Sequence, residues 1–182
     1  MPGVVEIVPA YETLGVYVDT ESFDQSRFLE AIRDIKPEKG STGKHHAVPV
    51  CYELGEDLED VASELGLTME EAVGLHSSIE YTCFAVGFVP GFPYLGYLPK
   101  GLCGLRRLPS PRVRVPRGAV GIAHDQTGIY PGEQPGGWRL IGRTPLSIVD
   151  LKDSFFPISA GDTVRFFRIS ASEFKSLEGQ RL

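Results

Sequence analysis

The chain has 182 residues, of which 42% are hydrophobic, and a formal net charge of −6. A chain of this length can bury one large core or two small ones. No apolar run approaches the roughly 18 residues of a membrane span, and the N-terminus lacks the basic start of a secretory signal, so we expect a cytoplasmic protein without a membrane partner. The three cysteines have no C-x-x-C spacing and the histidines no paired ligand spacing, so we expect neither disulfides nor a metal site.

The N-terminal residues predict a small α/β region. Strands are expected at 4–11 and 13–19, because these segments are rich in apolar and β-branched residues. A helix is expected at 22–35, opened by a capping box of Ser22 and Gln25.

A polar linker is predicted at 36–44, followed by a strand at 46–52. Two helices are then expected, one over 58–65 and one that opens at Thr68 with Glu71 three residues later. This pair resembles a helix-turn-helix, but it is acidic and has no Lys or Arg. DNA affinity depends on cations that neutralise phosphates, so we expect no nucleic-acid partner.

Two segments, 87–99 and 126–145, combine glycine, proline and aromatic residues. Proline fixes φ and glycine reaches conformations closed to other residues, so each backbone path is strongly constrained. The first segment follows a strand predicted at 80–89. The two constrained segments are either tight turns of a β-rich domain or the walls of a binding site.

The second half of the chain predicts an antiparallel β-barrel or sandwich. Short strands joined by Gly/Pro turns, with no long helix between them, are typical of these folds. The expected strands are 112–115, 119–123, 139–141, 146–149 and 163–169, and a capped turn starts at Ser170 with Glu173.

Charge is divided unevenly along the chain. Residues 51–99 contain no Lys or Arg, whereas residues 100–143 contain eight basic residues against only Asp125 and Glu133. Arginine forks match carboxylates and phosphates, so converging arginines would make a site for an anionic ligand. The alternative is that these arginines bond loop carbonyls at the surface.

Candidate site residues come mainly from the two constrained segments and the arginine-rich region. His76 and His124 are the candidates for proton transfer. The predicted binding residues are Phe92, Tyr94, Arg107, Arg112, Gln126, Tyr130, Gly136, Gly137, Trp138 and Arg143.

Together, GFVPGFPYLGYLP (87–99), PRVRVPRGAVGIAHDQTGIYP (111–131) and QPGGWRLIGRTP (134–145) resemble the family that contains KipI, allophanate hydrolase subunit 1 and the B-type subunit of 5-oxoprolinase (PxpB). The similarity continues through 48–88 upstream and 160–169 near the end. It implies an α+β protein with a cyclophilin-like antiparallel β-barrel at 81–182. It also implies a small α/β domain at 1–80 that is partial, because the family's first strand and helix have no counterpart in this sequence.

The resemblance also implies a function. Oxoprolinase members of the family act with a homologous second subunit (allophanate hydrolase subunit 2, or PxpC, type) and a LamB/YcsF-type subunit (PxpA). The complex opens the lactam of 5-oxoproline with ATP to give glutamate. The chain would then be a B-type subunit that is inactive alone, depends on ATP through the complex, and meets a small amide or carboxylate ligand.

The alternative within the family is a KipI-type regulator that binds and inhibits a sensor histidine kinase.

A third expectation concerns the N-terminal sheet. An α/β domain that lacks one strand leaves an open sheet edge, so we expect self-association or a partner chain to cover it.

Overall fold

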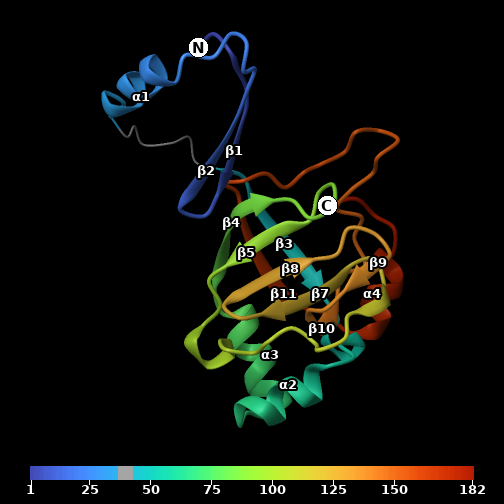
Figure 1. Cartoon of the computed structure of the whole chain (residues 1–182). Coiled ribbons are helices and arrows are strands. Elements are labelled where there is room, and N and C mark those ends of the chain that lie inside the picture. Colours follow the sequence, from blue (N-terminus) through green and yellow to red (C-terminus); the bar gives the residue numbers. More distant parts are fainter. Residues whose placement is uncertain (37–42) are drawn as a thin grey trace. The chain divides into compact units, whose positions relative to one another are not determined.

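The computed structural model describes residues 1–36 and 43–182. Internal contacts divide the chain into two compact units, Met1–Thr42 and Gly43–Leu182. The domain boundary expected after residue 80 stays a prediction, while the two compact units meet near residue 42, so the strand and helices between these positions belong to the second unit. Most of the predicted linker, residues 37–42, lies outside the described residues. Figure 1 labels the elements.

The first unit consists of a β-hairpin and one helix. Strands β1 (Val4–Ala10) and β2 (Thr13–Val18) pair antiparallel, and helix α1 spans Gln25–Arg33. No described residue of this unit is buried. The two predicted strands are confirmed, but the predicted partial α/β domain is not, because two strands and one exposed helix make no core of their own.

Helix α1 begins three residues later than predicted. Asp24, not Ser22, is its N-cap, and the Asp24 carboxylate accepts a hydrogen bond from the Arg27 backbone N–H at 3.0 Å. The Ser22 hydroxyl donates instead to Asp19 at 2.8 Å. The Asp19 carboxylate, three residues before Ser22, therefore holds Ser22 in a turn, and Asp24 caps the helix instead.

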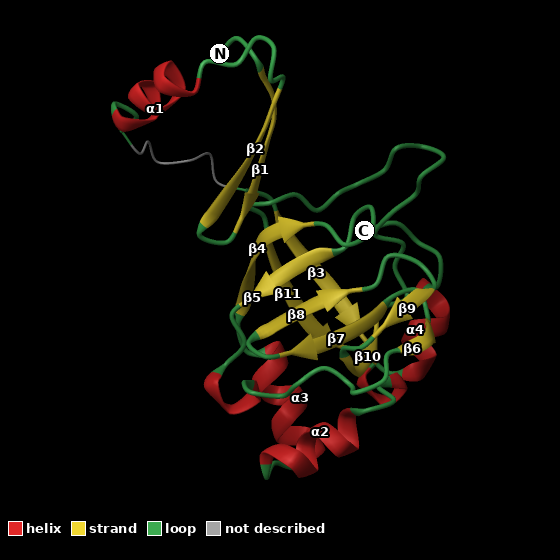
Figure 2. Ribbon diagram, viewed as in Figure 1, coloured by secondary structure: helices red, strands yellow, loops and turns green. Residues whose placement is uncertain are grey.

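The second unit is built around a seven-stranded sheet in the order β10-β7-β8-β5-β4-β11-β3 (Figures 1 and 2). Backbone hydrogen bonds between Cys51, just after β3, and Arg143, at the end of β10, join the two outer strands and nearly close the sheet into a barrel. Its strands are β3 (His45–Val50), β4 (Glu80–Val86), β5 (Pro93–Gly96), β7 (Ala119–Ala123), β8 (Gln126–Ile129), β10 (Arg139–Arg143) and β11 (Thr163–Arg168).

The barrel prediction holds in outline, with one correction. The β11–β3 pair is parallel, whereas the other pairs of this sheet are antiparallel. A parallel pair needs a long crossover, which the chain from Val50 to Thr163 provides. The core inside the sheet includes Val48, Tyr81, Leu95, Ile122 and Phe166.

A separate two-stranded sheet pairs β6 (Arg112–Val115) with β9 (Gln134–Gly136). The strand predicted at 146–149 does not form; this stretch makes only a bridge between Ser147 and Arg181. Strands β5, β8 and β9 lie inside the two constrained segments and were not predicted, because their glycines and prolines hide the alternation of a strand.

Helices α2 (Leu58–Leu65) and α3 (Met69–Ser77) lie at one end of the barrel, and Figure 2 shows them as a pair. The turn between them is at Gly66, whose φ of 68° favours glycine. The predicted capping boxes are confirmed at Thr68–Glu71 and, for α4 (Ala171–Leu177), at Ser170–Glu173. Among the described residues no helix is long and apolar enough to cross a membrane.

Candidate functional site

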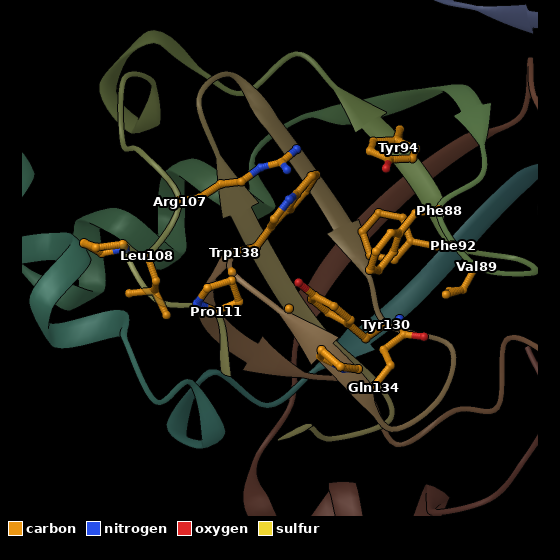
Figure 3. A pocket seen from close by; sticks show the side chains of 14 residues that line it. Phe88, Val89, Phe92, Tyr94, Arg107, Leu108, Pro111, Tyr130, Gln134 and Trp138 are labelled. Carbon is orange, nitrogen blue, oxygen red and sulfur yellow. The ribbon is translucent and has the colours of Figure 1, made fainter. Parts of the chain in front are cut away.

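A cavity of about 490 Å³ opens in the wall of the second unit. Figure 3 shows its lining side chains, which come from both constrained segments and from the loop before β6. Seven of the predicted binding residues line it together: Phe92, Tyr94, Arg107, Tyr130, Gly136, Gly137 and Trp138. A volume of this size is that of a small-molecule or side-chain pocket.

Phe92 is the centre of the aromatic wall. Its ring is buried and meets Tyr94, Tyr130 and Trp138 edge to face, with ring centroids 5.0, 5.2 and 5.4 Å apart respectively. Aromatic rings prefer this geometry because the positive edge of one faces the negative face of another. The four rings therefore hold each other in place and give the cavity a rigid apolar side.

Two glycines make this packing possible. A Cβ added to Gly136 would lie 2.4 Å from the Tyr130 hydroxyl oxygen, and one added to Gly128 would lie 2.8 Å from the Phe92 ring. No side chain fits at such distances, so glycine is required where backbone and ring approach. The glycine pattern seen in the sequence thus serves ring packing as well as turns.

Three polar groups face this apolar surface. The Arg107 guanidinium lies 6.0 Å from the centre of the Trp138 ring, in cation–π range, and no ion pair to Arg107 occurs among the described residues. Burial raises the pKa of the Tyr130 hydroxyl, which stays protonated at neutral pH. Gln134 is a third polar residue of the lining, and its amide nitrogen Nε2 is fully buried.

Two of the three predicted binding arginines do not line the cavity. Arg112 Nη2 donates to Asp57 Oδ1 at 2.6 Å, and this bond raises the Arg112 pKa. Arg143 Nε donates to the backbone carbonyl of Arg117 at 2.8 Å. For these two arginines, structural bonds within the protein replace the ligand contact that was predicted.

The Asp57–Arg112 pair links helix α2 to strands β6 and β10. Asp57 is 5% exposed, and its second oxygen accepts from the Leu140 backbone N–H at 2.6 Å. The Asp57 N–H donates in turn to the Leu140 carbonyl at 2.8 Å. Since Arg112 pairs with Gly136 in the sheet, this network supports the cavity wall from behind.

Gln126 and His124 also lie elsewhere. Gln126 begins β8, where it pairs with Gly96 and Ala123. His124 is exposed on the tight turn between β7 and β8, with a φ of 57°. Neither is among the residues that line the cavity.

His76 is a core residue rather than a surface group. Its ring is fully buried and stacks on Phe166, with centroids 4.6 Å apart. Nε2 lies 3.0 Å from the Thr127 hydroxyl and Nδ1 lies 2.7 Å from the Tyr52 hydroxyl. Because Thr127 donates to the Gly121 carbonyl, it accepts from Nε2–H, and Tyr52 then donates to Nδ1. Burial lowers the His76 pKa to about 3, so the ring is neutral.

The other half of the lining was not predicted. Phe88 and Val89 were within the first constrained segment, and Gln134 and Pro135 within the second, so position alone could have indicated them. The remaining members, Leu108, Pro109 and Pro111, come from the loop before β6, which carried no aromatic signal. Among the residues described, no cluster of three or more His, Cys, Asp or Glu could hold a metal ion.

Comparison with known proteins identifies the family of this chain. Residues 1–156 match the family described as "Carboxyltransferase domain, subdomain C and D". The B-type subunit of 5-oxoprolinase from Bacillus subtilis (strain 168) is 38% identical over 192 aligned residues, covering 95% of this chain and 79% of the relative. That of Escherichia coli O157:H7 is 42% identical, covering 91% and 78%. The chain belongs to the PxpB family of 5-oxoprolinase subunits.

A solved structure has a similar fold. The crystal structure of TTHA0988 is similar with a TM-score of 0.82 and 39% identity, covering 93% of this chain but 34% of that one. The chain therefore spans about a third of TTHA0988. All fourteen cavity-lining residues lie within the part that matches the family, whereas β11 and α4 follow it.

Proposed function

We propose that this chain is the B-type subunit of a complex that opens the lactam of 5-oxoproline with ATP and releases glutamate. The observation that carries the proposal is the 38–42% identity to B-type subunits of 5-oxoprolinase over at least 91% of the chain. The proposed companions are a homologous second subunit of the allophanate hydrolase subunit 2 (PxpC) type and a LamB/YcsF-type (PxpA) subunit.

The chemistry of the cavity supports a binding role. Its described lining contains no Ser, Thr, Cys, Asp, Glu, His or Lys, so it offers neither a nucleophile with a base nor a carboxylate for a metal. It does offer an aromatic wall for a flat ring and the Arg107 guanidinium for a carboxylate. We assign it to the small amide or carboxylate ligand, and bond breaking to groups from the companion subunits.

The test is reconstitution. The purified chain with 5-oxoproline, ATP and Mg²⁺ should release neither glutamate nor ADP, and glutamate should appear only when both companion subunits are added. A companion pair of full activity without this chain would contradict the proposal. So would turnover by the isolated chain. Inhibition of a sensor histidine kinase by the chain, without any effect on lactam opening, would favour the regulatory alternative.

A further inference from the structure

Phe88 is an exposed aromatic residue with a strained backbone at the rim of the cavity. Its φ is 66°, a value that is rare for residues other than glycine and unfavourable for bulky side chains. The Val89 N–H donates to the Gly87 carbonyl at 2.8 Å, which closes a three-residue γ-turn centred on Phe88. The Phe88 side chain lines the cavity, yet the residue is 62% exposed.

The loop that carries Phe88 is held in this conformation by further contacts. The Phe92 N–H donates to the Val89 carbonyl, and the Gly87 N–H donates to the Phe92 carbonyl, both at 3.1 Å. The Phe88 ring also meets the Phe92 ring edge to face, with centroids 5.6 Å apart. Because Phe92 is buried at the centre of the aromatic wall, the fold determines where the exposed ring lies (Figure 3).

The stability of the fold does not require an aromatic ring at this position. Glycine adopts the same φ without strain, and a smaller side chain exposes less apolar surface to water. Phe88 therefore destabilises the isolated chain in two ways. Strained residues of this kind cluster at binding sites, where the geometry serves a ligand. Since the Phe88 ring borders the cavity, an occupant of the cavity is the group that can cover it.

We propose that Phe88 determines specificity by covering the flat lactam ring of 5-oxoproline, whose carboxylate faces Arg107. The inference rests on the proposed function. In Figure 3 Phe88 lies across the cavity from Arg107 and Trp138, so one small ligand can offer its ring to Phe88 and its carboxylate to the guanidinium. An open-chain amide has no ring face to present. The Phe88 contact therefore favours a lactam over its open-chain analogues.

The single tryptophan of the chain, Trp138, reports binding because it lies in the cavity wall. Two probes isolate the ring contact. 5-Oxoproline carries the lactam ring, whereas N-acetylalanine carries the same amide and carboxylate but lacks one carbon–carbon bond of the ring. Each probe is titrated into the full chain, alone and with the companion subunits. The ratio of the two dissociation constants then measures the preference for the ring.

Phe88→Ala removes the ring and keeps the strained backbone. It should weaken binding of 5-oxoproline about threefold to tenfold and that of N-acetylalanine less, so that the preference for the lactam decreases. Phe88→Tyr keeps the ring and should retain the wild-type preference. Arg107→Met is the matched control, because it should weaken both probes alike, by about tenfold or more, and leave the ratio unchanged.

Phe88→Gly separates the effect on binding from the effect on stability. Glycine usually destabilises a protein relative to alanine, but at a positive φ the order reverses. We expect Phe88→Gly to unfold at a temperature about 2–4 °C above that of Phe88→Ala and to bind both probes as weakly as that variant. The glycine variant also repeats the binding test if the alanine variant does not fold.

Equal weakening of both probes by Phe88→Ala would make Phe88 a general apolar contact and overturn the proposal. Unchanged binding of 5-oxoproline would overturn it too, as would the absence of any saturable Trp138 response to 5-oxoproline in the wild-type chain and in the complex. An unfolding temperature of Phe88→Gly below that of Phe88→Ala would remove the strain on which the inference depends. Lactam turnover by the complex with any of these results would leave the proposed function intact and refute only the role of Phe88.

Discussion

The role of a single residue in this protein depends more on the groups that it contacts than on its residue type. Phe92, Tyr130 and Trp138 could be located at one site from the sequence, because glycine and proline beside aromatic rings indicate a constrained wall. The arginines could not, because the same guanidinium serves a ligand at Arg107 in our proposal and a buried carboxylate at Arg112. The role of Arg112 is decided by its contact with Asp57, 55 positions away in the sequence, and no local sequence pattern indicates such a contact.

His76 gives the residue scale a testable pH dependence. The pKa of His76 is about 3 in the folded protein, whereas the ordinary value for histidine is 6.5. At a pH between these values the unfolded chain binds a proton at His76 and the folded protein does not. Its contribution to stability is therefore complete above pH 6.5 and is lost as the pH falls towards 3. Between pH 7 and pH 5 the free energy of unfolding should fall by about 2 kcal/mol through this group.

The measurement is urea unfolding of the wild type and His76→Gln at both pH values. The variant is less stable at pH 7, but its loss between pH 7 and pH 5 should be smaller by about 2 kcal/mol. His124→Gln, which alters an exposed turn, serves as the control and should keep the wild-type pH dependence. Parallel pH profiles for His76→Gln and the wild type would show that burial of His76 carries no such penalty.

Among the secondary-structure elements, the helix caps could mostly be predicted from the sequence, whereas the pairing of the strands could not. Thr68 and Ser170 begin their helices as expected, since a capping box is local. The prediction that Ser22 is an N-cap was wrong, because the Ser22 hydroxyl donates to Asp19 instead. Strands β5 and β8 are defined by neighbours across the sheet rather than by alternation in their own sequence.

Strand β6 provides a matched pair of arginines. Arg112→Met would leave the Asp57 carboxylate, which is 5% exposed, without its cation, and we expect a loss of about 2–4 kcal/mol of stability. Arg114→Met on the same strand removes only an exposed contact with Glu133 at 3.7 Å and should cost less than about 1 kcal/mol. Chemical denaturation of both variants measures the difference. Equal effects would mean that the Asp57–Arg112 pair does not anchor β6.

For the whole molecule, burial separates the two units sharply. The first unit exposes large apolar side chains, among them Val5, Ile7, Leu14 and Tyr17, and has no buried residue in its described part. Local opening is easy where few apolar contacts must break. Backbone amides of residues 1–36 should therefore exchange with solvent much faster than those of strands β4, β8 and β11, as hydrogen–deuterium exchange can measure.

The same experiment examines the expected cover of the hairpin edge. Addition of the companion subunits, or a rise in protein concentration, should slow exchange in β1 and β2 if a partner or second copy binds there. A control peptide in β8 should keep its exchange rate. Slow exchange of residues 1–36 in the isolated, dilute chain would contradict the view that this unit is only marginally stable.

The position of β11 has a consequence for how the protein is made. This strand is synthesised after every other strand of the described sheet, yet it lies between β4 and β3 and is the strand that joins them there. Until the ribosome has passed residue 168, β3 and β4 have no common neighbour, and the nascent chain presents unpaired backbone edges. Closure must then wait for contacts more than a hundred residues apart, which slows folding and ties it to the synthesis of β11.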